Sequence, residues 1–424
     1  MHNAKKKFFF FVFIITIQCI AILSILAYLV FVAPGTGNKP ADNYIVPVNS
    51  TPADTLYNIK ADIEVSGNIV NITQDIKFES PQSKIYAYIP SANHAITTLK
   101  KITVDGMYKD SITDSMNLSI VCDKPQNSIS LEYELKLDSN RQTLSYSDSY
   151  ILLTNFLITP AVMKDGKPIQ LYKSSFGDPY IYNMNNYEIS IKADKSYNVF
   201  GPGQKGDKVS GSYRTAAFKA INLRDFPIVL AKNPNVKSEK HGNSTVYYIN
   251  SYSSRNYVNE ALTFAEKNIG AYPYKELFVV NAPISSNEGM EQSQMILISD
   301  RCFNNGNDLR GVTYHEIFHQ WFYNIIGTNQ LDEPFLDEGL VNYLSIILGG
   351  GHPSTFYDSS FLNMHLNNYS SRDQYMRLAY VNAAQYYSDI HKKMGNGFFK
   401  TLKKIYNDKK NSILYYKDFL KYTN

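Results

Sequence analysis

The segment His315-Glu316-Ile317-Phe318-His319 constrains this chain more than any other feature. In an α-helix, residues four apart lie on one face, so the two histidines can bind a single metal ion. Glu316 lies about 100° further around the helix, beside the metal and not on it. A carboxylate in that position can accept a proton from a metal-bound water, which indicates hydrolytic chemistry.

The flanking residues predict a helix around this segment. Asn307 or Asp308 can cap its N-terminus, and Gly327 stands where a C-cap belongs. Val312, Phe322 and Ile326 fall on the same face as the two histidines. We therefore expect the metal-binding face to be buried.

A third ligand follows at a suitable distance. Residues 320–337 separate His319 from Glu338, and a second short helix there would present its carboxylate to the metal. Two imidazoles, one carboxylate and an open fourth position are typical of catalytic zinc. Structural zinc sites are more often closed by cysteines, and none of the three cysteines lies near. The sequence predicts one catalytic Zn²⁺ per chain.

This pattern resembles that of a known family. Residues 315–319, the 18-residue spacing and Glu338 are similar to those of the aminopeptidase N-like gluzincins, peptidase family M one, and Gln320-Trp321 is also typical of them. The resemblance covers roughly residues 50–424 and is strongest over 254–345. It implies a peptide substrate and an N-terminal β domain that walls one side of the cleft.

The family's exopeptidase motif, Gly-x-Met-Glu-Asn, has a partial counterpart upstream. Here the segment reads Glu288-Gly289-Met290-Glu291-Gln292, so its first and last positions differ from the family pattern. The resemblance implies that Glu291 binds the free α-amine of the substrate, with Gly289 and Met290 beside it. Whether Glu288 adds charge for that amine or faces solvent stays open.

The resemblance also implies a tyrosine that donates a hydrogen bond to the developing oxyanion. Tyr380 opens an apolar, periodic stretch and is the first candidate, although Val381-Asn382-Ala383 replaces the family's usual triplet. Tyr387 is the second candidate. Asn342, one turn after Glu338, is expected to support that ligand through a hydrogen bond.

The predicted fold class is α+β. Residues 51–250 carry short stretches of alternating apolar and polar residues, such as 59–65 and 129–137, and predict an antiparallel β domain. From 254 the pattern becomes helical, with a first helix ending near Gly270. Residues 251–424 are assigned to the catalytic domain, for which the resemblance implies a thermolysin-like, mainly helical zinc metallopeptidase.

The N-terminus predicts a membrane anchor. Residues 8–33 form an apolar run of 26 residues after three lysines, which is long enough to cross a bilayer and longer than a signal-peptide core. We expect residues 1–7 to be a cytoplasmic basic tail, 8–33 a single transmembrane helix and 34–50 a linker. The catalytic body would then lie outside the cytoplasm, at the cell membrane.

Composition excludes some function classes. Lys+Arg 42 against Asp+Glu 38 gives a net charge of +4, without a basic stripe interleaved with aromatics, so nucleic-acid binding is not expected.

The favoured interpretation is a zinc aminopeptidase. A zinc endopeptidase without strict amine recognition and an inactive surface binding protein of the same fold remain as alternatives. The oligomeric state and the pairing of Cys122 with Cys302 stay open.

Overall fold

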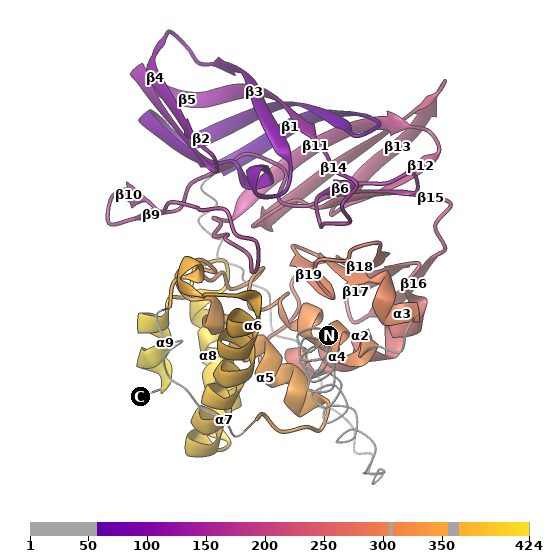
Figure 1. Cartoon of the computed structure of the whole chain (residues 1–424), viewed down its shortest axis with the longest axis vertical. Helices are drawn as coiled ribbons and strands as arrows, with labels where there is room; N and C mark the ends of the chain where they lie inside the picture. The colour runs from indigo at the N-terminus through magenta and orange to yellow at the C-terminus, as the bar shows by residue number, and fades with distance from the viewer. Residues whose placement is uncertain (1–56, 305–307, 355–363, 424) are drawn as a thin grey trace, which may run out of the picture.

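The computed structural model describes residues 57–304, 308–354 and 364–423. In these residues three larger β-sheets are stacked on a group of helices (Figure 1). The predicted order, a sheet-rich half followed by a mainly helical half, is confirmed. The predicted anchor 8–33, with its tail and linker, lies outside the described residues. Within the described ranges, no helix combines the length and the apolar character that a membrane crossing requires.

The large sheet forms the outer layer. Among the described residues it has nine strands, and its main path runs through β13 (Gln204–Ser210), β14 (Tyr213–Leu223), β11 (Asn185–Asp194), β1 (Tyr57–Ser66), β2 (Ile69–Tyr88), β5 (Asn117–Lys136) and β3 (Ile96–Thr103), with β4 (Tyr108–Asp114) beside β5 and β8 (Thr159–Pro160) beside β2. The predicted alternation in β1 is confirmed, because Ile59, Ala61, Ile63 and Val65 are all buried.

One strand pair corrects the prediction of an antiparallel domain. β1 and β11 run parallel, whereas the other pairs of this sheet in the described residues are antiparallel. The chain reaches β11 only after a long connection through β2 to β10, and such a connection can return it in the original direction. Alternation along a strand does not reveal the direction of its neighbour.

A small second sheet joins the two halves of the molecule. It consists of β12 (Tyr197–Phe200), β15 (Ile228–Lys232), β7 (Tyr150–Leu153) and β6 (Ser145–Tyr146). Ile151 and Leu153 of β7 belong to the core shared with the large sheet. Leu152 points the other way and packs with Val280 and Leu297 of the third sheet.

The third sheet positions the exopeptidase-like segment. Its order is β16 (Val236–His241), β17 (Ser244–Ile249), β18 (Glu276–Ala282), β20 (Met295–Ser299) and β19 (Gly289–Gln292). β17, β18 and β20 are parallel, and β19 lies antiparallel at the edge. The predicted domain boundary at residue 250 therefore falls within this sheet, since β16 and β17 precede it.

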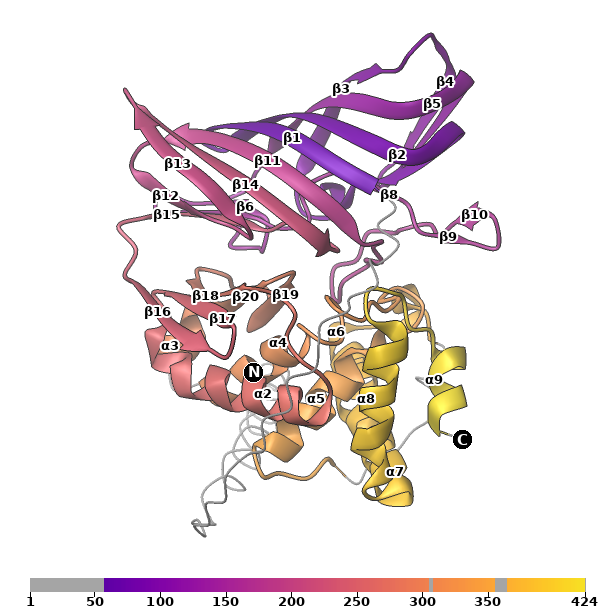
Figure 2. The ribbon, with the colours of Figure 1, turned by 180° about the vertical axis from the view of Figure 1, so that it is seen from behind.

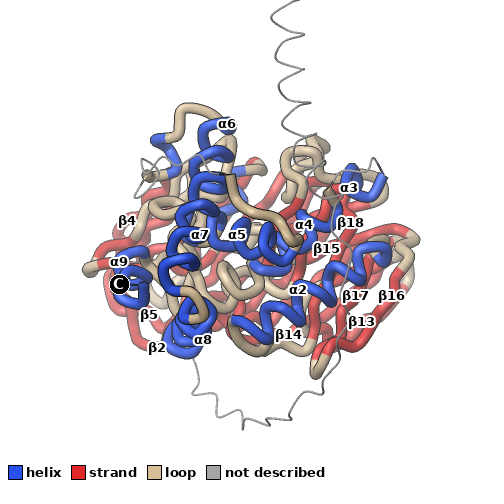
Figure 3. Tube along the Cα trace, turned by 90° about the horizontal axis from the view of Figure 1, so that it is seen from below, coloured by secondary structure: helices blue, strands red, loops and turns tan. Residues whose placement is uncertain are grey.

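The helices lie on the side of the third sheet away from the large sheet (Figures 2 and 3). They are α2 (Arg255–Asn268), α3 (Asp300–Asn304), α4 (Leu309–Phe318), α5 (Glu338–Leu348), α6 (Arg372–Tyr375), the π-helical η6 (Met376–Asn382), α7 (Ala383–Met394), α8 (Gly397–Lys409) and α9 (Tyr416–Thr423). Of these, α2 and α4 lie near the strands of this sheet, and α7 to α9 lie further to one side. The predicted helix before Gly270 is confirmed as α2. Phe318, Trp321 and Leu340 are fully buried in the core between helices and sheet.

The two cysteines whose pairing the sequence leaves open are both buried and free. Cys122 lies on β5 in the large sheet, and Cys302 lies on α3 beside the third sheet. The structure therefore contains no disulfide between them.

Candidate metal centre and active site

Helix α4 begins with a side-chain cap. Asp308 is its N-cap residue, and its Oδ1 accepts a hydrogen bond from the Gly311 backbone N–H at 2.8 Å. This satisfies one of the amides that lack a partner in the first turn. The alternative cap, Asn307, lies outside the described residues. The cap fixes the start of the helix that carries His315 and Glu316.

Helix α4 ends earlier than predicted, at Phe318 and not near Gly327. Beyond it, the backbone amides of residues 324–326 bond to the carbonyls of 319–321, five residues back, which widens the turn. Phe322 and Ile326 are therefore buried in this turn and not on a helix face. As a result, the Phe322 carbonyl lies 3.0 Å from His319 Nδ1. A bond from Nδ1–H to a carbonyl leaves Nε2 free as a metal ligand.

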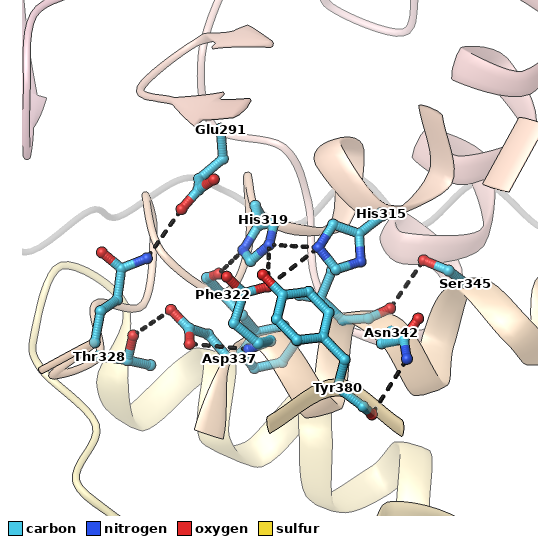
Figure 4. A network of polar contacts seen from close by, with 12 residues as sticks. Glu291, His315, His319, Phe322, Thr328, Asp337, Asn342, Ser345 and Tyr380 are labelled. Atoms are coloured by element: carbon cyan, nitrogen blue, oxygen red, sulfur yellow. Dashed lines mark hydrogen bonds and ion pairs between the residues drawn. The ribbon is translucent and has the colours of Figure 1, made fainter. Parts of the chain in front are cut away.

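Three ligand atoms converge between α4 and α5 (Figure 4). Glu338 Oε2 lies 3.2 Å from His315 Nε2 and 3.3 Å from His319 Nε2. The two Nε2 atoms are 3.1 Å apart. Ligands at about 2.0–2.2 Å from a tetrahedral zinc ion stand about 3.3–3.5 Å from one another. The three donor atoms therefore fit a single Zn²⁺ and leave its fourth position open.

Glu338 is held as the first residue of α5. The N-cap Asp337 accepts a hydrogen bond from the Glu338 backbone N–H at 2.9 Å, and Thr328 donates to the other Asp337 oxygen at 2.6 Å. Burial acts to raise the pKa of Glu338, but hydrogen bonds with His315 and His319 outweigh it and hold that pKa well below its usual range. The site therefore presents a carboxylate anion to a metal.

Glu316 lies beside the ligands, against the edge strand β19. A methyl group on Gly289 would overlap the Glu316 carboxyl group, so the glycine provides the space that this side chain occupies. Glu316 Oε2 is buried and has no hydrogen-bond partner among the described residues. Burial raises the pKa of Glu316 well above its usual range. A buried, unpaired carboxyl oxygen next to a zinc site is suited to accept a proton.

Strand β19 turns Glu291 toward the metal ligands and Met290 away from them. Glu291 Oε1 accepts a hydrogen bond from Gln330 Nε2 at 2.9 Å, and burial raises the pKa of Glu291. Met290 is in the apolar core with Leu152, because adjacent residues of a strand face opposite sides. The predicted substrate contact of Met290 is thus corrected to a packing role. Glu288 is exposed to solvent.

Asp178, which belongs to no recognisable sequence motif, completes an acidic group at the site. Ligand atoms of Asp178, Glu291 and Glu338 lie within 4.8 Å of one another. Burial and the neighbouring Glu291 raise the pKa of Asp178 well above its usual range. It comes from the irregular segment between β10 (Lys167–Pro168) and β11, where no periodic pattern identifies individual side chains.

Tyr380 lies over the metal ligands, and Tyr387 does not. The Tyr380 ring stacks on His315 with ring centroids 5.6 Å apart and an interplanar angle of 14°. Burial and then the charge of Glu338 raise the pKa of the Tyr380 hydroxyl well above its usual range, so it stays a hydrogen-bond donor. Tyr387 instead donates to the carbonyl of Leu336 at 3.1 Å, which is a packing role.

Asn342 has a different partner from the one expected. Its Nδ2 donates to the backbone carbonyl of Tyr380 at 3.2 Å, and not to Glu338 (Figure 4). The prediction that Asn342 supports the zinc ligand is therefore corrected. One helix, α5, carries both the third ligand and the residue that contacts the backbone of Tyr380.

Two residues of the N-terminal half, Arg224 and Asp225, form hydrogen bonds with the segments next to the site residues. The buried Arg224 guanidinium donates to the carbonyls of Tyr182 and Asn324, at 2.8 and 2.9 Å. Asp225 Oδ1 accepts from the Ser293 backbone N–H at 2.8 Å. Two adjacent residues thus fix the turn that follows His319 and the end of the strand that carries Glu291. Neither residue belongs to a recognisable sequence motif.

Comparisons with known proteins agree with this geometry. Residues 253–394 match the sequence model of the peptidase family M1 domain, and no curated protein matches the chain. An M1 zinc metallopeptidase mutant from Deinococcus radiodurans is similar at 12% identity and a TM-score of 0.63, over 87% of this chain and 90% of that one. The same enzyme is also known with a Tyr-Ser-Ala substrate, at a TM-score of 0.62.

A second solved structure has a longer chain. Legionella pneumophila aminopeptidase A, in complex with aspartic acid, is 14% identical with a TM-score of 0.66. The similarity covers 88% of this chain and 48% of that one. At these identities the structural comparisons show a shared fold, while the matched domain contains all three converging metal ligands. The chain is a zinc metallopeptidase, and its residues 253–394 match the peptidase family M1 domain.

Proposed function

We propose that this chain is a membrane-anchored, extracytoplasmic aminopeptidase that hydrolyses the N-terminal peptide bond of peptides. The observation that carries the aminopeptidase proposal is the acidic group of Glu291, Asp178 and Glu338, with ligand atoms within 4.8 Å of one another at the metal centre. The buried Glu291 and Glu338 and the half-buried Asp178 repel one another when ionised, and a cation relieves that repulsion. A zinc ion would neutralise the negative charge of Glu338. The α-ammonium of a substrate would neutralise the negative charge of Glu291 and Asp178.

The position of this group sets which bond is cut. An ammonium held by Glu291 stands at a fixed distance from the three metal ligands, so only the first peptide bond of the substrate reaches the metal centre. Gln330 holds Glu291 in place through a 2.9 Å hydrogen bond. The Deinococcus enzyme with bound Tyr-Ser-Ala, although similar in fold alone, is consistent with a peptide substrate.

The chain's own residues supply the remaining steps. His315, His319 and Glu338 would hold the zinc ion, which would supply polarisation of the scissile carbonyl and acidification of a water molecule. Glu316 accepts the proton of that water and returns it to the leaving amine. Tyr380 donates a hydrogen bond to the oxyanion that develops on the substrate carbonyl.

The experiment that tests the activity compares one peptide set with free and with acetylated N-termini. The full chain is used, with Glu316→Gln as the inactive control. We expect cleavage of the free peptides alone, and its loss in the control. Cleavage of both sets would instead support an endopeptidase. Cleavage of neither by a zinc-loaded chain would support a binding protein.

Membrane anchoring is supported by the sequence of residues 1–33, where lysines at 5–7 precede the apolar run. Cells that express the full chain provide the test. We expect the protein to stay in the membrane fraction after an alkaline wash, and its catalytic body to be digested by protease added outside the cytoplasmic membrane. Release by the wash, or full protection from the protease, would contradict this part of the proposal.

A further inference from the structure

Helix α5 contacts η6 through two residues on one face. Gly339 and Asn342 are three positions apart, so they lie on the same side of the helix. A methyl group on Gly339 would overlap the side chain of Ala383 and come within 3.2 Å of the Ala379 carbonyl oxygen. The glycine therefore allows a close approach, and at this approach Asn342 Nδ2 reaches the Tyr380 carbonyl at 3.2 Å.

The segment that carries Tyr380 has an uncommon backbone. Residues Met376–Asn382 form a π-helix, a conformation found mostly as single turns and often at functional sites. Its end is irregular, since the Ala383 backbone N–H is shared between the carbonyls of Leu378 and Tyr380. The Tyr380 carbonyl therefore shares the Ala383 amide with the Leu378 carbonyl. Asn342 supplies a second donor to that same oxygen.

We propose that Asn342 is a positioning residue for Tyr380. By holding the Tyr380 carbonyl, it keeps the π-helical turn in register with α5. The Tyr380 ring then remains stacked on His315, and its hydroxyl remains beside Glu338. Because Glu338 opens the same helix, α5 sets the distance between the zinc ligand and the oxyanion donor. This inference rests on the proposed role of Tyr380 in the reaction.

The side chain at position 342 is suited to substitution. Asn342 is only partly buried, and the structure gives its amide nitrogen no bond to a metal ligand. A matched control lies one turn away on the same helix. Ser345 is buried and donates to the Val341 carbonyl at 2.9 Å, so this hydrogen bond lies within its own helix (Figure 4).

The test is a double-mutant cycle on the full, zinc-loaded chain. Asn342→Leu, Asn342→Ala, Tyr380→Phe and the combinations are compared with Ser345→Ala. Misplacement of a catalytic group by about 1 Å costs up to about a hundredfold, so we expect kcat to fall roughly ten- to hundredfold in either Asn342 variant. KM and zinc content should stay near the wild-type values. In the Tyr380→Phe background the same substitutions should lower kcat by less than about threefold.

Three results would overturn the inference. If the Asn342 variants lose as much activity without the Tyr380 hydroxyl as with it, the role of Asn342 is structural. If they match the wild-type kcat, the hydrogen bond has no role in turnover. If Tyr380→Phe itself keeps the wild-type kcat, then the proposed role of Tyr380 fails first. Ser345→Ala should match the wild type in kcat and KM, and thermal melting identifies any variant that fails to fold.

Discussion

The metal side and the substrate side of the site are built differently. His315, Glu316, His319 and Glu338 all come from one short stretch of chain, on α4, its C-cap and the start of α5. Asp178, Glu291 and Tyr380 come from an irregular segment, an edge strand and a π-helix that are distant in sequence. Helical periodicity brings His315 and His319 together and the next helix adds Glu338, whereas the second group depends on how distant sheets and helices pack. The metal side should therefore be chemically indispensable, and the substrate side should be adjustable.

Removal of a zinc ligand should have the largest effect. We expect His319→Ala to lose the metal on dialysis and all zinc-dependent hydrolysis with it, because a site of three protein ligands has none to spare. Elemental analysis of the dialysed protein, compared with the wild type, measures this. Full zinc occupancy in the variant would show that these three residues are not the ligand set.

Removal of the base should separate binding of the metal from catalysis. Glu316→Gln should keep one zinc per chain and lose turnover by about 10²–10⁴-fold, the usual contribution of general acid–base catalysis. The wild-type chain, assayed at the same zinc content, is the reference. Equal turnover in the two proteins would refute the role of Glu316.

Substitutions on the substrate side should reduce the activity on peptides with a free N-terminus. Glu291→Gln and Asp178→Asn each weaken a contact to a charged amine, so kcat/KM on peptides with a free N-terminus should fall about 10- to 100-fold, with zinc retained. Glu288→Gln is the matched control, because Glu288 is a solvent-exposed carboxylate of the same strand region. An equal loss in all three variants would indicate a general charge effect in place of amine recognition.

Gly289→Ala tests the contact between the substrate side, at Gly289, and the metal side, at Glu316. The added methyl group would overlap the Glu316 carboxyl group, so we expect the base to shift and kcat to fall about tenfold, with zinc content unchanged. Gly206→Ala is the control, since nothing lies within 4 Å of a methyl group at Gly206 on β13. Wild-type kcat in Gly289→Ala would mean that Glu316 can act from a different position.

The difference between the metal side and the substrate side also explains which parts of the structure could be predicted from the sequence. The spacing of His315 and His319 follows from the helical repeat, Glu338 was predicted on a second short helix, and alternation identified strands such as β1. The early end of α4 depends on a turn that Arg224 holds from the N-terminal half, so no local signal marks it. Asp178 lies in a segment without periodicity. The opposite directions of Met290 and Glu291 do follow from strand alternation, once the segment is known to be a strand.

A charge pair remote from both sides should have the smallest effect, on stability alone. His241 on β16 and Glu266 on α2 lie 3.1 Å apart, and the hydrogen bond with Glu266 raises the pKa of His241. A raised pKa in the folded state stabilises the fold below the ordinary histidine pKa of about 6.5, and this contribution is lost as the pH rises through the raised value. Glu266→Gln should therefore lower the melting temperature more at pH 5.5 than at pH 8.5, by no more than about 3 °C. At matched pH its kcat should equal that of the wild type, which gives the baseline for substitutions outside the site. An equal change in melting temperature at the two pH values would show that the protonated form of His241 contributes nothing.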